Sequence, residues 1–179
     1  MMTTRSGLKT ENCMPFDTVL SAGFAKDGMF MVMRQDNQWN FVHKAILEPI
    51  SEQWFDRVRP FFNGYAAVCK KDKWTYMDDS GDLLSELKFD EVKDFGEGFG
   101  AVRVKKTWSY LDKEGDLHGK YSAATQFVRG HATVVIRKKY YIITSSFKKI
   151  AGPFEYASNI LTAGTVIVRD KDGQRVMLL

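Results

Sequence analysis

Residues 55–83 read FDRVRPFFNGYAAVCKKDKWTYMDDSGDL, and residues 89–117 read FDEVKDFGEGFGAVRVKKTWSYLDKEGDL. The two stretches are identical at 14 of 29 positions, with a constant offset of 34 residues. A fixed offset of this size is typical of repeat proteins, in which each unit buries its apolar face against its neighbours. The sequence therefore predicts a row of similar units.

The repeat extends beyond these two copies. Its marker aromatics are Trp39, Trp74, Trp108 and Tyr140. Each unit opens on an aromatic residue followed by a polar one: Phe16-Asp17, Phe55-Asp56, Phe89-Asp90, Tyr121-Ser122 and Phe154-Glu155. We predict a poorly ordered leader over residues 1–15 and one repeat domain over residues 16–179, with units that start near residues 16, 55, 89, 121 and 154.

Within a unit, the residue pattern is that of β-strands. Val, Tyr, Phe and Ala alternate with other residues between turn signals, such as Asn63-Gly64, which favour a positive φ. A second strand surrounds the Trp, and an acidic turn containing Gly leads into a third. The predicted fold is all-β: stacked antiparallel units of about three short strands, forming an open sheet or part of a propeller.

Aligned positions predict ladders of buried side chains between units. The three ladders are Phe30, Tyr65, Phe99 and His131; then Met33, Val68, Val102 and Val134; then Trp39, Trp74, Trp108 and Tyr140. Large aromatic side chains dominate such cores. The opening acids Asp17, Asp56 and Asp90 are expected to accept backbone N–H bonds in their turns.

The order FDxVxxF, then G-F/Y-x-A-V, then K-W-x-Y-x-D-x-x-G-D-L resembles the WG (KWG) β-repeat of bacterial proteins. The resemblance covers most of residues 16–179 and is strongest in units two and three. The Gly that names the repeat is replaced by Asn40, Thr75, Ser109 and Tyr141. The resemblance implies an all-β repeat scaffold that serves in binding.

The composition indicates a folded protein, because 44% of the 179 residues are hydrophobic. No stretch approaches the roughly 20 consecutive apolar residues of a membrane helix, and the N-terminus lacks a signal-peptide pattern. Cys13 and Cys69 are too few for a disulfide framework. We expect a cytoplasmic protein.

No set of residues with catalytic spacing is found. His43, His118 and His131 lie in different units, and no glycine-rich run precedes a helix. His131 is interpreted as a core residue and Cys69 as a small, partly buried one. We expect no enzymatic activity, no metal and no cofactor.

Charged residues gather at two kinds of turn. The candidate partner-binding residues are the acids of units two and three: Asp78, Asp79, Asp82, Glu91, Asp94, Glu97, Asp112, Glu114 and Asp116. Turn acids such as Asp78 and Asp79 are expected to be solvated and bonded to backbone N–H groups, and to contribute little burial. Basic clusters at residues 70–73, 103–106 and 137–139 recur at one repeat position, with Lys148-Lys149 nearby, and are interpreted mainly as solubilising hairpin tips.

The expected function is protein binding, since repeat sheets offer wide, rigid surfaces. By analogy of class and size, we favour a bacterial immunity protein that neutralises a protein toxin, as in contact-dependent growth inhibition. The acidic turns would steer a basic toxin such as a ribonuclease. The alternative is nucleic-acid binding through the basic residues 129–149, and a hydrolase ranks third. No membrane partner is expected.

Overall fold

A computed structural model describes residues 18–21, 28–45 and 48–179, and this part of the chain forms seventeen strands in five antiparallel sheets. The first sheet holds β1 (Thr18–Ser21), β2 (Met29–Met33) and β3 (Trp39–His43), and the second holds β4 (Arg57–Val58), β5 (Tyr65–Lys70) and β6 (Lys73–Asp78). The third holds β7 (Glu91–Val92), β8 (Gly100–Val104), β9 (Thr107–Leu111) and β10 (Leu117–Tyr121). The fourth holds β11 (Ala123–Ala124), β12 (His131–Ile136), β13 (Lys139–Thr144) and β14 (Lys149–Phe154), and the fifth β15 (Tyr156–Ala157), β16 (Thr165–Asp170) and β17 (Gly173–Leu178). The predicted all-β fold is confirmed.

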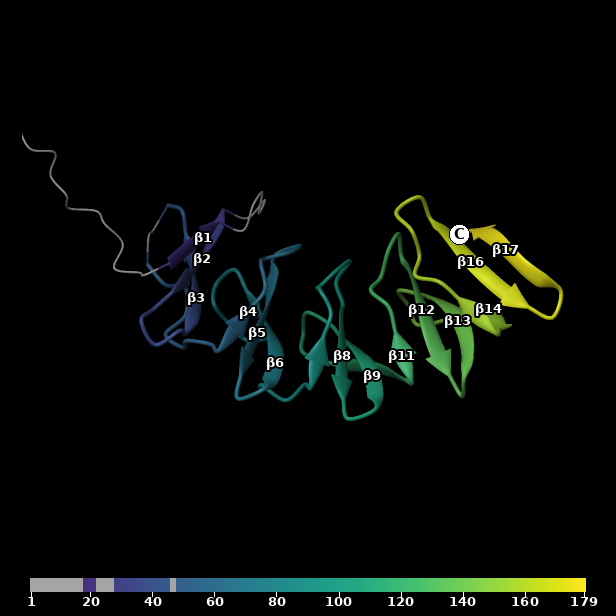
Figure 1. Cartoon of the computed structure of the whole chain (residues 1–179), viewed down its shortest axis with the longest axis horizontal. Helices are drawn as coiled ribbons and strands as arrows, with labels where there is room; N and C mark the ends of the chain where they lie inside the picture. The colour runs from purple at the N-terminus through teal and green to yellow at the C-terminus, as the bar shows by residue number, and fades with distance from the viewer. Residues whose placement is uncertain (1–17, 22–27, 46–47) are drawn as a thin grey trace, which may run out of the picture.

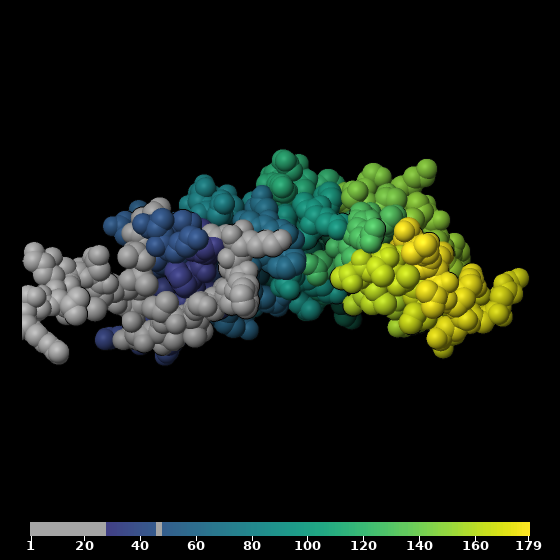
Figure 2. Space-filling view, turned by 90° about the horizontal axis from the view of Figure 1, so that it is seen from above, coloured from purple at the N-terminus to yellow at the C-terminus, as the bar shows by residue number. Residues whose placement is uncertain are grey.

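The sheets follow one another in chain order along a shallow arc (Figure 1). Seen from above, the units lie side by side along the long axis of the molecule (Figure 2). Among the described strands, no pairing joins the first sheet to the fifth, so the row is open.

The hydrophobic core is divided into four clusters, each shared by two successive units. The cluster between the first two sheets includes Phe41, Phe55 and Val68, and the cluster between the last two includes Ile142 and Val168. Two further clusters join the second sheet to the third and the third to the fourth. Since no unit has a core of its own, each is stabilised by its neighbours.

The chain passes from one sheet to the next within a single residue step. Phe89 exchanges backbone hydrogen bonds with Trp74 in the second sheet, and the N–H of the next residue, Asp90, bonds to the carbonyl of Arg103 in the third. The other units cross at the same place: Phe55 pairs with Trp39, Tyr121 with Trp108, and Phe154 with Tyr140. The aromatic that opens a unit in sequence therefore closes the preceding sheet.

Two kinds of tight turn join the long strands. Asn63 and Gly64 have φ values of 54° and 83°, and Phe62 and Tyr65 exchange hydrogen bonds across them, as predicted for a turn that requires positive φ. Residues 97–98 and 129–130 repeat this turn. The opposite hairpin ends of units two and four turn at residues 71–72 and 137–138, also with positive φ.

The predicted register of the first unit was wrong by one residue. Val32, fully buried, takes the place of Val68, and Met29 takes that of Tyr65; the alignment had assigned these places to Met33 and Phe30. The cause is the β2–β3 hairpin, whose three-residue loop ends on Asn37 with φ of 59°, whereas the β5–β6 hairpin has a two-residue loop. A one-residue shift moves every side chain of a strand to the other face.

Candidate functional site

Two of the nine candidate acids hold their own turns. The Asp78 Oδ1 atom accepts hydrogen bonds from the N–H groups of Ser80 and Asp82, at 3.0 and 2.9 Å. Asp112 makes the same two bonds 34 residues later, at 3.1 and 2.7 Å, to residues 114 and 116. The prediction that turn acids bond to backbone N–H groups is confirmed for Asp78, and Asp112 makes the equivalent bonds.

Asp112 also contacts His118, which follows Gly-Asp-Leu at a repeat junction, where the sequence allowed a pair with a carboxylate. Its Oδ2 atom lies 2.5 Å from Nε2 of His118, whose ring stacks on Phe147 of the next unit. Burial alone would raise the pKa of the Asp112 carboxyl, but the bonds from His118 and from the turn hold it below its ordinary value. Asp112 is therefore part of the joint between units three and four.

Three further candidate acids are engaged in ion pairs or backbone hydrogen bonds. Glu91 pairs with Arg103 at 2.8 Å, and Asp94 lies 3.6 Å from Arg59. Glu97 accepts hydrogen bonds of 2.6 Å from two successive N–H groups of the next unit, at residues 129 and 130. These carboxylates serve contacts within the row.

The remaining four acids, Asp79, Asp82, Glu114 and Asp116, are exposed, and their carboxylates form no hydrogen bond or ion pair with another described residue. They lie on two neighbouring turns beside Tyr65. Burial is the main factor that raises the pKa of Tyr65, and the charges of Asp78, Asp79 and Glu114 raise it further. Four unpaired carboxylates thus share one region of the surface. We call them the acidic patch.

The two turns of the acidic patch lie so close to the preceding unit that only glycine fits at one position of each turn. A Cβ atom on Gly81 would lie 1.9 Å from the carbonyl oxygen of Ile50, and one on Gly115 would lie 2.6 Å from that of Leu84. Each turn thus packs against the backbone of the preceding unit, and both glycines have φ of 89°. The patch is part of a rigid joint between units.

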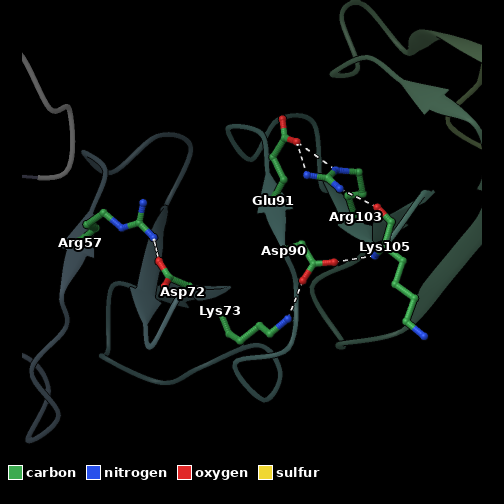
Figure 3. A network of polar contacts seen from close by, with 7 residues as sticks. All are labelled: Arg57, Asp72, Lys73, Asp90, Glu91, Arg103 and Lys105. Atoms are coloured by element: carbon green, nitrogen blue, oxygen red, sulfur yellow. Dashed lines mark hydrogen bonds and ion pairs between the residues drawn. The ribbon is translucent and has the colours of Figure 1, made fainter.

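Some basic side chains at the hairpin ends of units two and three are paired with acids (Figure 3). Arg57 contacts Asp72 at 2.7 Å, and Lys73 reaches across to Asp90 of the next unit at 2.5 Å. Asp90 also accepts a bond from the N–H of Lys105, as predicted for an opening acid. The bond from Lys73, followed by that from Lys105, lowers the pKa of the Asp90 carboxyl. In the predicted basic stripe of these two units, Lys73 and Arg103 are thus ion-paired, whereas the side chains of Lys70, Lys71, Lys105 and Lys106 pair with no acid in the described part of the chain.

Unit four differs, because Arg137, Lys138 and Lys139 form no ion pair with any residue in the described ranges. Arg137 shares a shallow pocket of about 280 Å³ with Lys106 and Lys120. Bases without an acidic partner in the described structure thus lie at the tips of units two, three and four, and in unit four they include all three tip residues.

The sequence profile of the WG-containing repeat matches residues 55–74 and 74–108. The middle of this chain is thus similar in sequence to the WG-containing repeat. The matched residues cover the second sheet and the strands β7 and β8, together with the crossings at Phe55 and Phe89. No curated protein sequence matches the chain.

The glycine that names the WG repeat is replaced here by polar residues with a structural role. Asn40 is fully buried, and its Nδ2 atom donates to the carbonyl of Ser51 at 2.7 Å. Thr75 contacts Ser85 at 2.8 Å, and Ser109 donates to the carbonyl of Gly119 at the same distance. In these units, the substituted position connects the strand that carries the Trp to the segment that returns along it.

Several solved structures are similar in shape to this row of units. KlHsv2 with loop 6CD replaced by a Gly-Ser linker has a TM-score of 0.49 at 16% identity, over 84% of this chain and 59% of that one. BamB from Moraxella catarrhalis has a TM-score of 0.46 at 10% identity, over 90% and 56%. The WD40 β-propeller domain of Doa1 has a TM-score of 0.39 at 10% identity, over 84% and 60%. The chain thus spans less than two thirds of each. No partner or activity follows from these likenesses.

Sequence reasoning missed the side chains that bond one unit to the next. Tyr76 donates its hydroxyl to the carbonyl of Lys93 at 2.5 Å, and Tyr110 donates to that of Thr125 at 2.7 Å. Lys93 itself donates to the carbonyl of Ala124 at 2.7 Å. The Tyr of K-W-x-Y recurs at a 34-residue offset, which was an available signal, but its partner lies in another unit.

The other singled-out residues have structural surroundings. Cys69 is fully buried, and burial raises the pKa of its thiol. His131 is only half-buried, and its Nδ1 atom lies 2.8 Å from the carbonyl of Arg129 in its own turn. Cys13 and Asp17 lie outside the described residues, as does the predicted leader. None of the described elements is a helix that could cross a lipid bilayer.

Proposed function

We propose that this chain is a non-catalytic protein-binding module whose acidic patch binds a basic protein domain. The observation that carries the proposal is that Asp79, Asp82, Glu114 and Asp116 are exposed and unpaired, while the other five candidate acids serve the fold. Free carboxylates on a rigid support attract a cationic partner without an ordering cost on this side of the interface.

The partner that we propose is a basic bacterial toxin domain, such as a ribonuclease, which this chain would bind and neutralise in the cytoplasm. A nuclease needs a positively charged cleft to hold its substrate, so an acidic surface can occupy that cleft. The support for this partner class is charge complementarity and analogy with small immunity proteins.

The test uses a variant that removes the acidic patch alone: Asp79→Asn, Asp82→Asn, Glu114→Gln and Asp116→Asn together. We expect its association rate with the toxin domain encoded beside this gene to fall by about tenfold or more at low salt. Asp78 and Asp112 are kept, because they hold the turns. The unfolding midpoint should stay at the wild-type value, which separates a binding defect from a folding defect.

The matched control removes positive charge from the fourth unit: Arg137→Gln, Lys138→Gln and Lys139→Gln. Under the proposal, this variant binds the toxin domain as wild type does. Both variants are measured by biolayer interferometry at two salt concentrations, against the toxin domain and against single-stranded RNA. A defect confined to the basic variant, and seen only with RNA, would contradict the proposal.

That second result would support the alternative, nucleic-acid binding. The observation in its favour is that Arg137, Lys138 and Lys139 have no acidic partner in the described structure and lie beside Lys106 and Lys120. Binding of RNA through these side chains should weaken steeply as the salt concentration rises. The slope of log K against log salt concentration should decrease in magnitude by roughly one for each phosphate contact removed.

A further inference from the structure

A groove of about 540 Å³ opens between the fourth sheet and the fifth. Lys93 lines it from the third unit, Thr125 and Tyr140 from the fourth, and Tyr156 and Ser158 from the fifth. Its volume lies within the range of about 300–1,000 Å³ that small-molecule sites in proteins occupy.

The groove is present because unit four departs from the pattern of units two and three. In those units, the marker Trp is covered by cationic side chains: Arg57 and Arg59 lie 5.2 and 5.0 Å from the ring centre of Trp74, and Lys93 and Arg103 lie 5.0 and 5.8 Å from that of Trp108. Long side chains thus fill the space beside each Trp.

In unit four, the same backbone places carry short side chains. Thr125 occupies the place that Arg59 holds in unit two and Lys93 in unit three. In each unit, the N–H of this residue donates to the carbonyl of the residue eight positions later: Ala67, Ala101 and Thr133. Likewise, Ala123 pairs with Val135 where Arg57 pairs with Cys69 and Glu91 with Arg103. Tyr140 replaces the Trp. The loss of three long side chains leaves the space beside Tyr140 open.

One charged group, Lys93, lines this groove. The Lys93 side chain is half-buried, donates to the carbonyl of Ala124 and forms no ion pair with a described residue. The nearby carboxylate of Glu91 is held by Arg103 instead. Burial lowers the pKa of the Lys93 amine, which indicates that its positive charge is incompletely solvated. A bound anion would supply the missing charge partner.

The remaining groove surface favours an aromatic group. Tyr140 and Tyr156 present rings whose centres lie 5.6 Å apart, and Tyr156 is 40% exposed. The hydroxyls of Thr133 and Ser158 are already bonded, to the carbonyls of Ser158 and Asn159. Apolar and ring contacts are therefore available there, with one cation at the end of the groove.

We propose that this groove binds a small aromatic carboxylate, with the carboxylate on the Lys93 ammonium and the ring against Tyr140 and Tyr156. The site is separate from the acidic patch and does not depend on the proposed protein partner.

The probe for this site is 1-naphthoate, compared with its neutral analogue 1-naphthamide, in isothermal titration calorimetry and amide-shift NMR. We expect 1-naphthoate to bind with a Kd on the order of 0.1–1 mM, as its size allows. Its shifts should map to residues around Tyr140 and Tyr156, and 1-naphthamide should bind at least tenfold more weakly. Equal binding of the two, shifts elsewhere on the protein, or no binding at 10 mM would overturn the proposal.

Three variants sharpen this test. Lys93→Met removes the charge and should weaken 1-naphthoate binding at least tenfold. Thr125→Lys restores the long side chain of the repeat pattern, fills the groove and should abolish binding. Arg59→Met is the matched control, because Arg59 makes the equivalent bond to the next unit, at 3.0 Å to the carbonyl of Val92, away from the groove. Wild-type affinity in Thr125→Lys, or a tenfold loss in Arg59→Met, would contradict the site.

Discussion

Phe89 and Trp74 exchange backbone hydrogen bonds in both directions, with N···O distances of 2.8 and 3.1 Å, although the repeat pattern assigns them to different units. The next N–H along the chain, that of Asp90, bonds 2.8 Å away to Arg103 in the following sheet. Two neighbouring sheets thus share one continuous backbone segment with no linker between them. We expect neighbouring units to unfold together for this reason.

Because the acidic turns pack against the backbone of the preceding unit, two glycine substitutions should lower the free energy of unfolding by different amounts. Gly115→Ala and Gly98→Ala both place a side chain at φ near 90°, so both carry a backbone cost of about 1–2 kcal/mol. A Cβ at Gly98 meets nothing within 4 Å, whereas one at Gly115 meets a backbone oxygen. Gly115→Ala should therefore cost a further ~1–3 kcal/mol in urea denaturation. Equal losses of unfolding free energy in the two variants would show that the turn at Gly115 does not pack against the preceding unit.

The bond from Tyr110 to the next unit predicts a loss of stability in Tyr110→Phe. Removing the hydroxyl leaves the carbonyl of Thr125 without this donor, at a cost of about 1–3 kcal/mol in the free energy of unfolding at pH 7. The ring itself fits, because Phe41 occupies the same place in unit one. Tyr156→Phe is the control, since that residue is partly exposed, and should change stability by less than ~0.5 kcal/mol.

Tyr110 also predicts a dependence of stability on alkaline pH. Burial raises the pKa of Tyr110 above the ordinary value of 10.0, so the folded protein keeps its proton when the unfolded chain has lost it. The contribution of the Tyr110 hydroxyl to the free energy of unfolding is fully present below pH 10. Above that pH the contribution falls by about 1.4 kcal/mol per pH unit. The stability difference between wild type and Tyr110→Phe should shrink between pH 9.5 and pH 11. A constant difference would mean that Tyr110 ionises normally.

The uncovered face of the fifth sheet predicts different costs at two equivalent positions. Ile142 pairs with Thr133 and is fully buried under the fifth sheet, whereas Val176, which pairs with Ile167 at the same place one unit later, is 68% exposed. Ile142→Ala should cost ~2–5 kcal/mol and Val176→Ala less than about 1 kcal/mol. Guanidinium unfolding of both variants measures this. A comparable loss in Val176→Ala would indicate that its face is covered in solution.

Glu97 bonds to the next unit and Glu114 is exposed, so replacing these two glutamates should affect stability differently. Glu97→Ala removes two hydrogen bonds to the next unit and should lower the free energy of unfolding by about 1 kcal/mol. Glu114→Ala removes an exposed carboxylate without a partner and should be neutral within ~0.5 kcal/mol. Thermal unfolding of the two variants under one set of conditions compares them directly. If Glu114→Ala were the more damaging, the acidic patch would not be free for a partner.

The sequence by itself determined the repeat, the strand class and the turns. These properties are local: Asn63-Gly64 requires positive φ wherever it lies, and alternating residues around Trp74 and Trp108 form strands whatever covers them. The all-β row could therefore be predicted from the 34-residue offset together with the strand pattern and the turn signals. Asp56 and Asp90 do accept a backbone N–H bond, as predicted, but the donors are Lys71 and Lys105 at hairpin tips 15 residues away and not groups of the acids' own turns.

Only the tertiary structure decided which polar groups are free and where space remains. Asp78 and Asp79 are neighbours in the sequence, yet one holds its turn and the other is exposed, because the distinction depends on the direction of each side chain from the turn. The groove beside Tyr140 exists because Ala123, Thr125 and Val135 meet in space, although Ala123 and Val135 are twelve residues apart in the chain. The one-residue longer hairpin of unit one likewise appears only in its pairing. A repeat period specifies what recurs in each unit, whereas these features arise from contacts across units and from the residues that break the pattern.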